Sequence, residues 1–292
     1  MVDTKGKEQW SDKLVRVINS TICFTLAYVV INFGGFFSMA LMGKFFNFDA
    51  NIYYFGIRFL LNGNRWTKLK VSMIYSTYPF FALLFGLLML YIFDRVKRKP
   101  ALLNVFLVWA FVIGTCFFTA QGIIASLGIN EFNSPFYQNF AVVFTWWFLP
   151  APFTYAINVL FGILILFFAI NYPKMFLSFS YSFSKVNKSS RRRTYFIETA
   201  VVPFIIGALV TTAILWDKTG SARFHVLLHV IYLMTIGISL LISWVALYYL
   251  EILKDDVLKY KVLQSFGFVM FIALIFIVGF IKFTWHGIFV SF

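Results

Sequence analysis

Charged residues are scarce in this sequence. Only 12% of the 292 residues are charged, whereas 61% are apolar and the mean hydropathy is +0.84. Soluble proteins carry about 25% charged and about 45–50% apolar residues. A soluble fold of this size would expose large apolar patches if it had to accommodate so many Phe and Leu side chains. The composition therefore excludes an ordinary soluble domain and indicates a lipid environment.

Cysteine and histidine are also rare. The two cysteines, Cys23 and Cys116, both lie inside apolar runs and have no CxxC partner. We interpret them as small buried apolar side chains, because a disulfide scaffold or a zinc site requires more cysteines at closer spacing. The three histidines are His225, His229 and His286.

Several sequence motifs of known chemistry are missing. The chain has no P-loop, no GxGxxG and no GxSxG in a suitable context, and no HExxH. No apolar segment carries the paired carboxylates of a proton or sodium carrier, an arginine-rich voltage sensor or a selectivity-filter loop. These absences favour a protein that is not an enzyme.

Long apolar runs are what the sequence does contain. A membrane-spanning helix needs about 20 mainly apolar residues. By this criterion the candidate spans are about 18–42, 71–93, 101–126, 140–170, 197–216, 224–250 and 262–284. The first run is too long for a signal-peptide core, so we expect an uncleaved first helix. The sequence predicts an all-α, polytopic membrane protein of about seven helices, with residues 1–292 forming a single transmembrane domain.

The fourth candidate span is too long for one straight helix. Pro150 and Pro152 interrupt it, and each lacks a backbone donor and clashes with the preceding helical turn. Two arrangements satisfy this pattern. One is an interfacial or half-membrane helix over 138–149 followed by a full crossing over 151–171, and the other is a single kinked helix. Trp146 and Trp147 before the prolines favour an interfacial segment.

The distribution of basic residues predicts an orientation. The formal net charge is +14, and about two thirds of the 25 Lys and Arg residues fall in loops that share one side if the N-terminus is cytoplasmic. We therefore expect a cytoplasmic N-terminus and an external C-terminus, in a bacterial inner membrane. The basic loops would contact anionic lipid headgroups, and we do not expect nucleic-acid binding.

One loop does not fit this charge pattern. Residues 43–70 contain five basic residues but fall on the external side. This segment is aromatic around Arg58, and "NGN" at 62–64 is a hairpin-type turn signal. It could form an edge hairpin on the membrane surface or a re-entrant element, or else the first helix is inverted.

Polar residues within the spans are candidates for function, because polar groups are costly in lipid. Glu198 lies about one turn inside the fifth span. It could serve transport, or it could be a helix N-terminal carboxylate paired with Arg192 or Arg193. Asn104, Gln121 and Asn158 are further transport candidates, and their structural alternative is hydrogen bonding between helices.

The histidines suggest a second kind of site. His225 and His229 are four residues apart, so they lie on one side of the sixth span, and the predicted orientation brings His286 and Asp217 to the same membrane face. These four residues could bind a divalent metal. The alternatives are a polar membrane-interface role, which Trp216 and Trp285 at the same depth support, and a proton-responsive group.

Three functions are consistent with these features. The first is a non-enzymatic membrane subunit or scaffold that packs against other membrane proteins or lipids. The second is a transporter or channel for a small or lipid-like substrate, using the broken fourth helix and Glu198. The third is a metal-dependent membrane enzyme or redox subunit with the histidine site.

Overall fold

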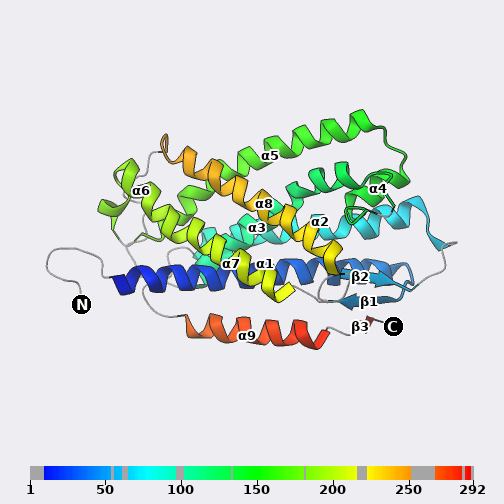
Figure 1. Cartoon of the computed structure of the whole chain (residues 1–292), viewed down its shortest axis with the longest axis horizontal. Helices are drawn as coiled ribbons and strands as arrows, with labels where there is room; N and C mark the ends of the chain where they lie inside the picture. Colours follow the sequence, from blue (N-terminus) through cyan, green and yellow to red (C-terminus); the bar gives the residue numbers. More distant parts are fainter. Residues whose placement is uncertain are drawn as a thin grey trace.

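The computed structural model is a bundle of long helices with a small sheet at one end (Figure 1). It describes residues 10–53, 56–60, 65–96, 102–132, 134–180, 182–215, 222–250, 267–284 and 287–290. The helices of this part of the chain are α1 (Trp10–Phe45), α2 (Lys68–Val96), α3 (Leu102–Gly128), α4 (Phe140–Trp146), α5 (Ala151–Ser178), α6 (Ser189–Phe196), α7 (Val202–Leu215), α8 (Ala222–Ala246) and α9 (Phe268–Phe283). The strands are β1 (Ala50–Tyr53), β2 (Gly56–Phe59) and β3 (Ile288–Val290).

Within the described part of the chain, six helical segments are long and apolar enough to cross a membrane. They are α1, α2, α3, α5, α8 and the continuous segment Ser189–Leu215, in which a π-helical turn, Ile197–Val201, joins α6 to α7. The predicted helical membrane bundle is thereby supported. The seventh predicted span is represented by α9, whose 16 residues extend about 24 Å at 1.5 Å per residue. This is less than the roughly 30 Å of a hydrocarbon core, and residues 262–266 of that prediction lie outside the described part.

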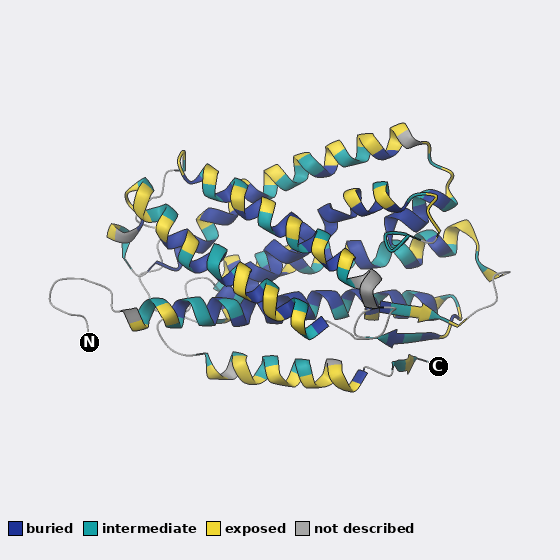
Figure 2. Ribbon diagram, in the orientation of Figure 1, coloured by how far each residue is buried: buried dark blue, intermediate teal, exposed yellow. Residues whose placement is uncertain are grey.

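Helix α3 is the centre of the bundle. It packs against α1, α2, α4, α5 and α8, and 83% of its most apolar window is buried, compared with 17% for α5. Figure 2 shows buried residues concentrated on α1 and α3, and exposed ones along α5 and α9. The exposed residues of α5 are mostly apolar, such as Val159, Ile163 and Phe167. A helix that is apolar all round suits a position between protein and lipid.

The two ends of the bundle differ. The basic end contains the N-terminal end of α1, the C-terminal end of α2, α6 and the C-terminal end of α8 (Figure 1). The sheet end contains the three strands, α4 and the N-terminal end of α8. These names are used below for the two ends.

The basic loop 43–70 forms a hairpin. Strands β1 and β2 pair antiparallel, with Ala50 opposite Phe59 and Tyr53 opposite Gly56, and the buried residues Ala50 and Ile52 alternate with half-buried ones. The predicted hairpin is present, whereas its position at a membrane surface stays a prediction, and "NGN" at 62–64 comes after β2 in the sequence and not between the two strands. Because Tyr53 pairs with Gly56, two residues, 54 and 55, separate the strands in the sequence, and both lie outside the described part. Strand β3 pairs with the other edge of β1, giving the order β2-β1-β3.

The backbones of α2 and α3 approach each other closely at Gly86 and Gly114. A Cβ atom added to Gly114 would lie 2.4 Å from the carbonyl oxygen of Ala82 and 3.0 Å from the Cα atom of Gly86. Small residues permit such contacts between membrane helices. On α5, in contrast, a Cβ added to Gly162 meets no atom within 4 Å.

We therefore expect Gly114→Ala to separate α2 from α3 and to reduce stability by about 1–3 kcal/mol, the usual cost of overpacking. Gly162→Ala is the matched control, because it adds the same methyl group to an open surface and improves helix propensity by up to about 1 kcal/mol. Thermal unfolding of the two purified variants in the same detergent measures the difference. Equal melting temperatures for both variants would contradict this account of the α2–α3 contact.

Candidate functional site

The interior of the bundle contains two clusters of polar side chains. The Glu198 cluster comprises Lys13, Arg16, Tyr195 and Glu198, near the basic end. The His229 cluster comprises Tyr28, Asn32, Tyr78, Gln121, Asn139, His229 and Tyr232, nearer the sheet end. Helix α1 contributes to both clusters, since Arg16, Ser20, Tyr28 and Asn32 form a polar stripe along its buried side.

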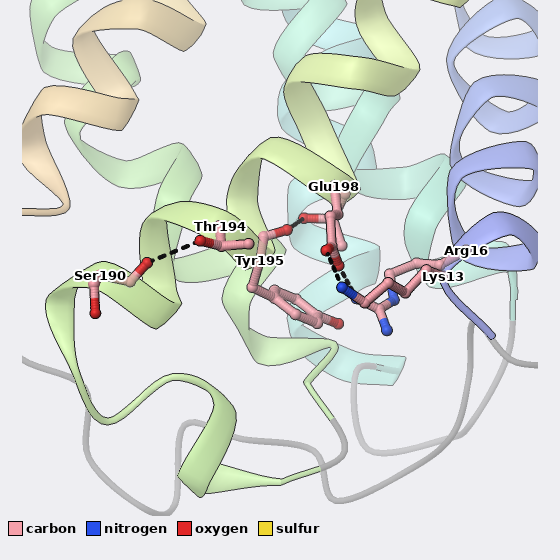
Figure 3. Close-up of polar contacts among 7 residues, drawn as sticks. Lys13, Arg16, Ser190, Thr194, Tyr195 and Glu198 are labelled. Atoms are coloured by element: carbon pink, nitrogen blue, oxygen red, sulfur yellow. Dashed lines mark hydrogen bonds and ion pairs between the residues drawn. The ribbon is translucent and has the colours of Figure 1, made fainter. Parts of the chain in front are cut away.

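Glu198 is held by two cations from α1. Its carboxylate oxygens lie 2.8 Å from Nη1 of Arg16 and 3.0 Å from Nζ of Lys13. Arg16 is only 2% exposed, and its guanidinium group lies over the Tyr195 ring, 4.7 Å from the centroid. Figure 3 shows both cations extending from α1 toward Glu198. The pair joins α1 to the α6–α7 segment with its charges largely removed from water.

The π-helical turn Ile197–Val201 explains how Glu198 reaches α1. Such turns add one residue to a helical turn and occur frequently at functional sites. Pro203 follows closely and cannot donate a backbone hydrogen bond to the carbonyl of Thr199, four residues earlier. Ser20 supplies the missing donor, because its hydroxyl donates to the Thr199 carbonyl at 2.6 Å while accepting a hydrogen bond from Nε1 of Trp109 at 2.9 Å.

The expected partners of Glu198, Arg192 and Arg193, lie elsewhere. Arg192 donates a hydrogen bond to the carbonyl of Leu250, and the guanidinium of Arg193 stacks over Trp244, 3.6 Å from the ring centroid. Side chains three or four residues apart share a helix face, whereas those five or six apart do not. The arginines therefore face α8 while Glu198 faces α1, and the predicted pairing was wrong.

The His229 cluster links α1, α2, α3 and α8. Tyr28 Oη and His229 Nδ1 share a hydrogen bond of 2.8 Å, Tyr78 donates to Oδ1 of Asn32 at 2.9 Å, and Nε2 of Gln121 donates to Tyr232 Oη at 2.9 Å. His229 is only 6% exposed. It therefore points into the protein and not toward lipid.

Further contacts complete this cluster. The side chain of Tyr232 also forms hydrogen bonds with Tyr78 and Asn139. A cavity of about 10 Å³ adjoins the cluster, lined by Asn32, Phe36, Tyr78, Gln138, Asn139, Leu228, His229 and Tyr232. This volume is about what one water molecule needs, and the polar lining offers it several hydrogen-bonding partners.

The residues just before the short helix α4, Gln138 and Asn139, line this cavity, and a break in the fourth segment follows the helix. α4 ends at Trp146, Pro150 caps the start of α5, and Pro152 lies in the first turn of α5. The chain thus follows the predicted arrangement of a short helix and then a full crossing, in place of one kinked helix. Asn139 has a φ of 49°, an uncommon value for a residue other than glycine. Irregular backbone at membrane depth needs protein contacts of this kind.

The other predicted amides tie neighbouring helices. Asn104 is fully buried, and its Nδ2 lies 3.5 Å from the carbonyl of Val96, the last residue of α2. Asn158 on α5 donates to the hydroxyl of Ser126 on α3. Both contacts agree with the structural alternative, in which amides hold the helices together.

The proposed metal site involves residues that the structure describes only in part. Asp217, His286 and the side chain of His225 lie outside the described residues. Within the described ranges, no group of three or more His, Cys, Asp or Glu side chains is arranged to bind a metal. The Nδ1 atom of His229 shares a hydrogen bond with Tyr28, so the metal site stays a prediction.

Arg16, Tyr28, Tyr78 and Tyr232 are site residues that the sequence alone did not indicate. A signal for two of them was present. Residues 16, 20, 28 and 32 follow one side of a helix, and three of them are strongly polar within a mainly apolar span. Tyr78 and Tyr232 carry no comparable signal, because buried tyrosines occur in many apolar helices.

We expect Glu198→Gln to reduce the free energy of unfolding by about 3 kcal/mol, because it leaves the buried Arg16 charge without its carboxylate. Adding Arg16→Met should restore part of that loss. Lys13→Gln is the control and should cost less than about 1 kcal/mol, since Lys13 is 40% exposed. Detergent-induced unfolding followed by tryptophan fluorescence measures all four proteins. A Glu198→Gln effect no larger than that of Lys13→Gln would show that the buried pair does not stabilise the bundle.

Comparison with known proteins gives no family for this chain: no family model, no curated protein and no solved structure matches it.

Proposed function

We propose that this chain is a non-enzymatic integral membrane subunit that acts as a helical scaffold for other membrane proteins and lipids. The observation that carries the proposal is that ionisable side chains in the interior of the bundle bind one another or other side chains of the bundle. Glu198, Arg16 and His229 are each engaged by another side chain of the bundle. Catalytic and transport groups need access to a substrate, whereas groups that bind one another between helices hold those helices in place.

The interior hydrogen bonds support the same role. Many of them connect different helices, as between Thr115 and Tyr172 at 2.6 Å or between Ser243 and the Ala169 carbonyl at 2.7 Å. Stacked rings reinforce them, with Phe117 and Tyr232 centroids 4.2 Å apart. Such contacts favour a rigid bundle whose outer apolar faces remain available to neighbours.

The orientation belongs to the same proposal. The basic end would face the cytoplasm, because positively charged loops are retained there. Lys68 and Lys70 at the sheet end are placed against aromatic rings, 4.9 Å from the centroids of Phe148 and Phe48 respectively. These contacts with aromatic rings stabilise two basic side chains at the sheet end, which would face away from the cytoplasm.

The test is photocrosslinking in native membranes. A photoreactive amino acid replaces Leu160 on α5, Leu209 on α7 or Phe276 on α9, all of which are more than half exposed. A scaffold subunit should give discrete crosslinked protein products from one of these faces and few from the others, because a partner covers one side of the bundle. A chain that crosslinks to no protein from any of the three faces, and that is extracted as a monomer, would contradict the scaffold role.

A second candidate function is transport of a proton or small solute. The observation that favours it is the irregular backbone just before α4, where Gln138 and Asn139 line the water-sized cavity at His229. Discontinuous helices form substrate sites in many transporters. In this alternative the described arrangement is a closed state.

Proton flux into liposomes that contain the purified chain and a pH-sensitive dye tests this alternative. Transport through the interior predicts a flux that His229→Gln and Glu198→Gln both reduce, by about tenfold or more. Asn171→Ala is the control, because Asn171 is exposed on α5 and bonds only to its own helix. Flux equal to that of empty liposomes, or equal in all variants, counts against proton transport.

A further inference from the structure

An open apolar groove lies between α5 and α8. It has a volume of about 560 Å³ and is lined by Ile170, Leu241, Ile242, Val245, Ala246, Tyr249 and Leu250. Every lining residue is apolar or aromatic, so the groove offers no partner to a polar solute. Its chemistry suits a hydrocarbon chain.

The groove reaches the basic end of the bundle, where arginines meet it. Arg192 on α6 donates a hydrogen bond to the carbonyl of Leu250, which lines the groove. Arg193 lies over Trp244, two residues before Ala246. Arg191 is exposed and donates to the Ser184 carbonyl at 2.9 Å. Arg192 and Arg193 therefore contact the C-terminal part of α8 and the residue Leu250 beyond it, where the groove ends.

These arginines lack a described counter-ion. Glu198, the carboxylate nearest to them in sequence, is engaged by Lys13 and Arg16. Within the part of the chain that the structure describes, no carboxylate lies within ion-pairing distance of Arg191, Arg192 or Arg193. The Nε atoms of Arg192 and Arg193 are buried and have no hydrogen-bond partner among the described residues. This arrangement favours an added anion with several acceptor oxygens.

Aromatic residues place this end of the groove at headgroup depth. Tyr248 and Tyr249 follow the end of α8 and are 65% and 81% exposed. Tyrosines of this kind concentrate at the boundary between hydrocarbon and water. The arginines are thus located where a lipid phosphate would be, and the groove extends from there into the hydrocarbon.

We propose that the groove between α5 and α8 binds one anionic phospholipid, with an acyl chain along the groove and the headgroup phosphate bound by Arg192 together with Arg191 or Arg193. This lipid would be a ligand of the scaffold proposed above, but its binding does not require the scaffold role, because a transporter could hold a lipid in the same groove. The positive charges of the arginines favour an anionic headgroup over a neutral one.

A second groove supplies an internal control. It lies between α7 and α8, has a volume of about 710 Å³, and is lined by Phe204, Ile205, Ala208, Leu209, Thr212, Ala213 and Leu233. None of these residues is charged. It should therefore accept acyl chains without preference for an anionic headgroup.

The experiment is a lipid titration of the purified full-length chain in detergent, read by native mass spectrometry. Phosphatidylglycerol and phosphatidylcholine with identical acyl chains are compared, and soluble glycerol phosphate is tested in parallel. We expect one phosphatidylglycerol to bind at least about tenfold more tightly than phosphatidylcholine, and glycerol phosphate not to bind detectably. Each arginine contributes roughly fivefold to such a preference.

Two variants and two matched controls locate the site. Arg192→Gln combined with Arg193→Gln should remove the preference for phosphatidylglycerol, and Ala246→Phe should weaken binding by filling the groove. Arg95→Gln removes another exposed arginine of the basic end, and Ala208→Phe fills the second groove, so both should retain the preference.

Several outcomes would overturn the proposal. The first is equal binding of phosphatidylglycerol and phosphatidylcholine by the wild-type chain. This comparison does not depend on whether any variant folds. The others are full binding by glycerol phosphate alone, which would indicate a phosphate site in place of a lipid site, and equal loss in Arg95→Gln and in the double variant. None of these results depends on whether a protein partner is crosslinked, so the lipid site and the scaffold role can fail separately.

Discussion

The hydrocarbon core of a membrane offers polar groups no water, and the internal contacts of this bundle are arranged accordingly. A buried charge in such a medium must be paired within the protein, since an unpaired one costs several kcal/mol. Arg16 and Glu198 meet that requirement across two helices that are far apart in the sequence. Their pairing joins α1 to the α6–α7 segment, and it leaves Arg191, Arg192 and Arg193 without a carboxylate partner among the described residues.

Two irregularities of the backbone make these contacts possible. The π-helical turn at Ile197–Val201 precedes a proline, and Ser20 compensates for the missing donor. The chain just before α4 is also irregular, since Asn139 has a positive φ and lines the cavity that His229 and Tyr232 share. At the first of these places, a side chain from another helix supplies a hydrogen bond that the backbone lost. A regular helix at either site would direct its polar side chains elsewhere.

The predictable features of the sequence are those governed by local composition. Spans such as α2 and α3 follow from the thickness of the membrane, and the break before α5 follows from Pro150, whose ring excludes a continuous helix. The partner of Glu198 could not be obtained in the same way, because it depends on the rotation of each helix about its own axis and on which helices become neighbours. The three-residue strand β3 is likewise too short to have a periodic signal. The sequence predicts which polar residues enter the membrane, and tertiary packing determines which of them meet.

The pairing of β1 with β3 has a consequence for the order of assembly. Residues 50–52 leave the ribosome well before their partners at 288–290, which follow more than 230 residues later. Contacts of such large sequence separation form late, since they require most of the intervening chain to be in place. The hairpin of β1 and β2 therefore has an open edge throughout synthesis and membrane insertion, and it acquires its third strand only when α9 has been delivered alongside α1. Completion of the sheet thus depends on α9 having reached its place beside α1.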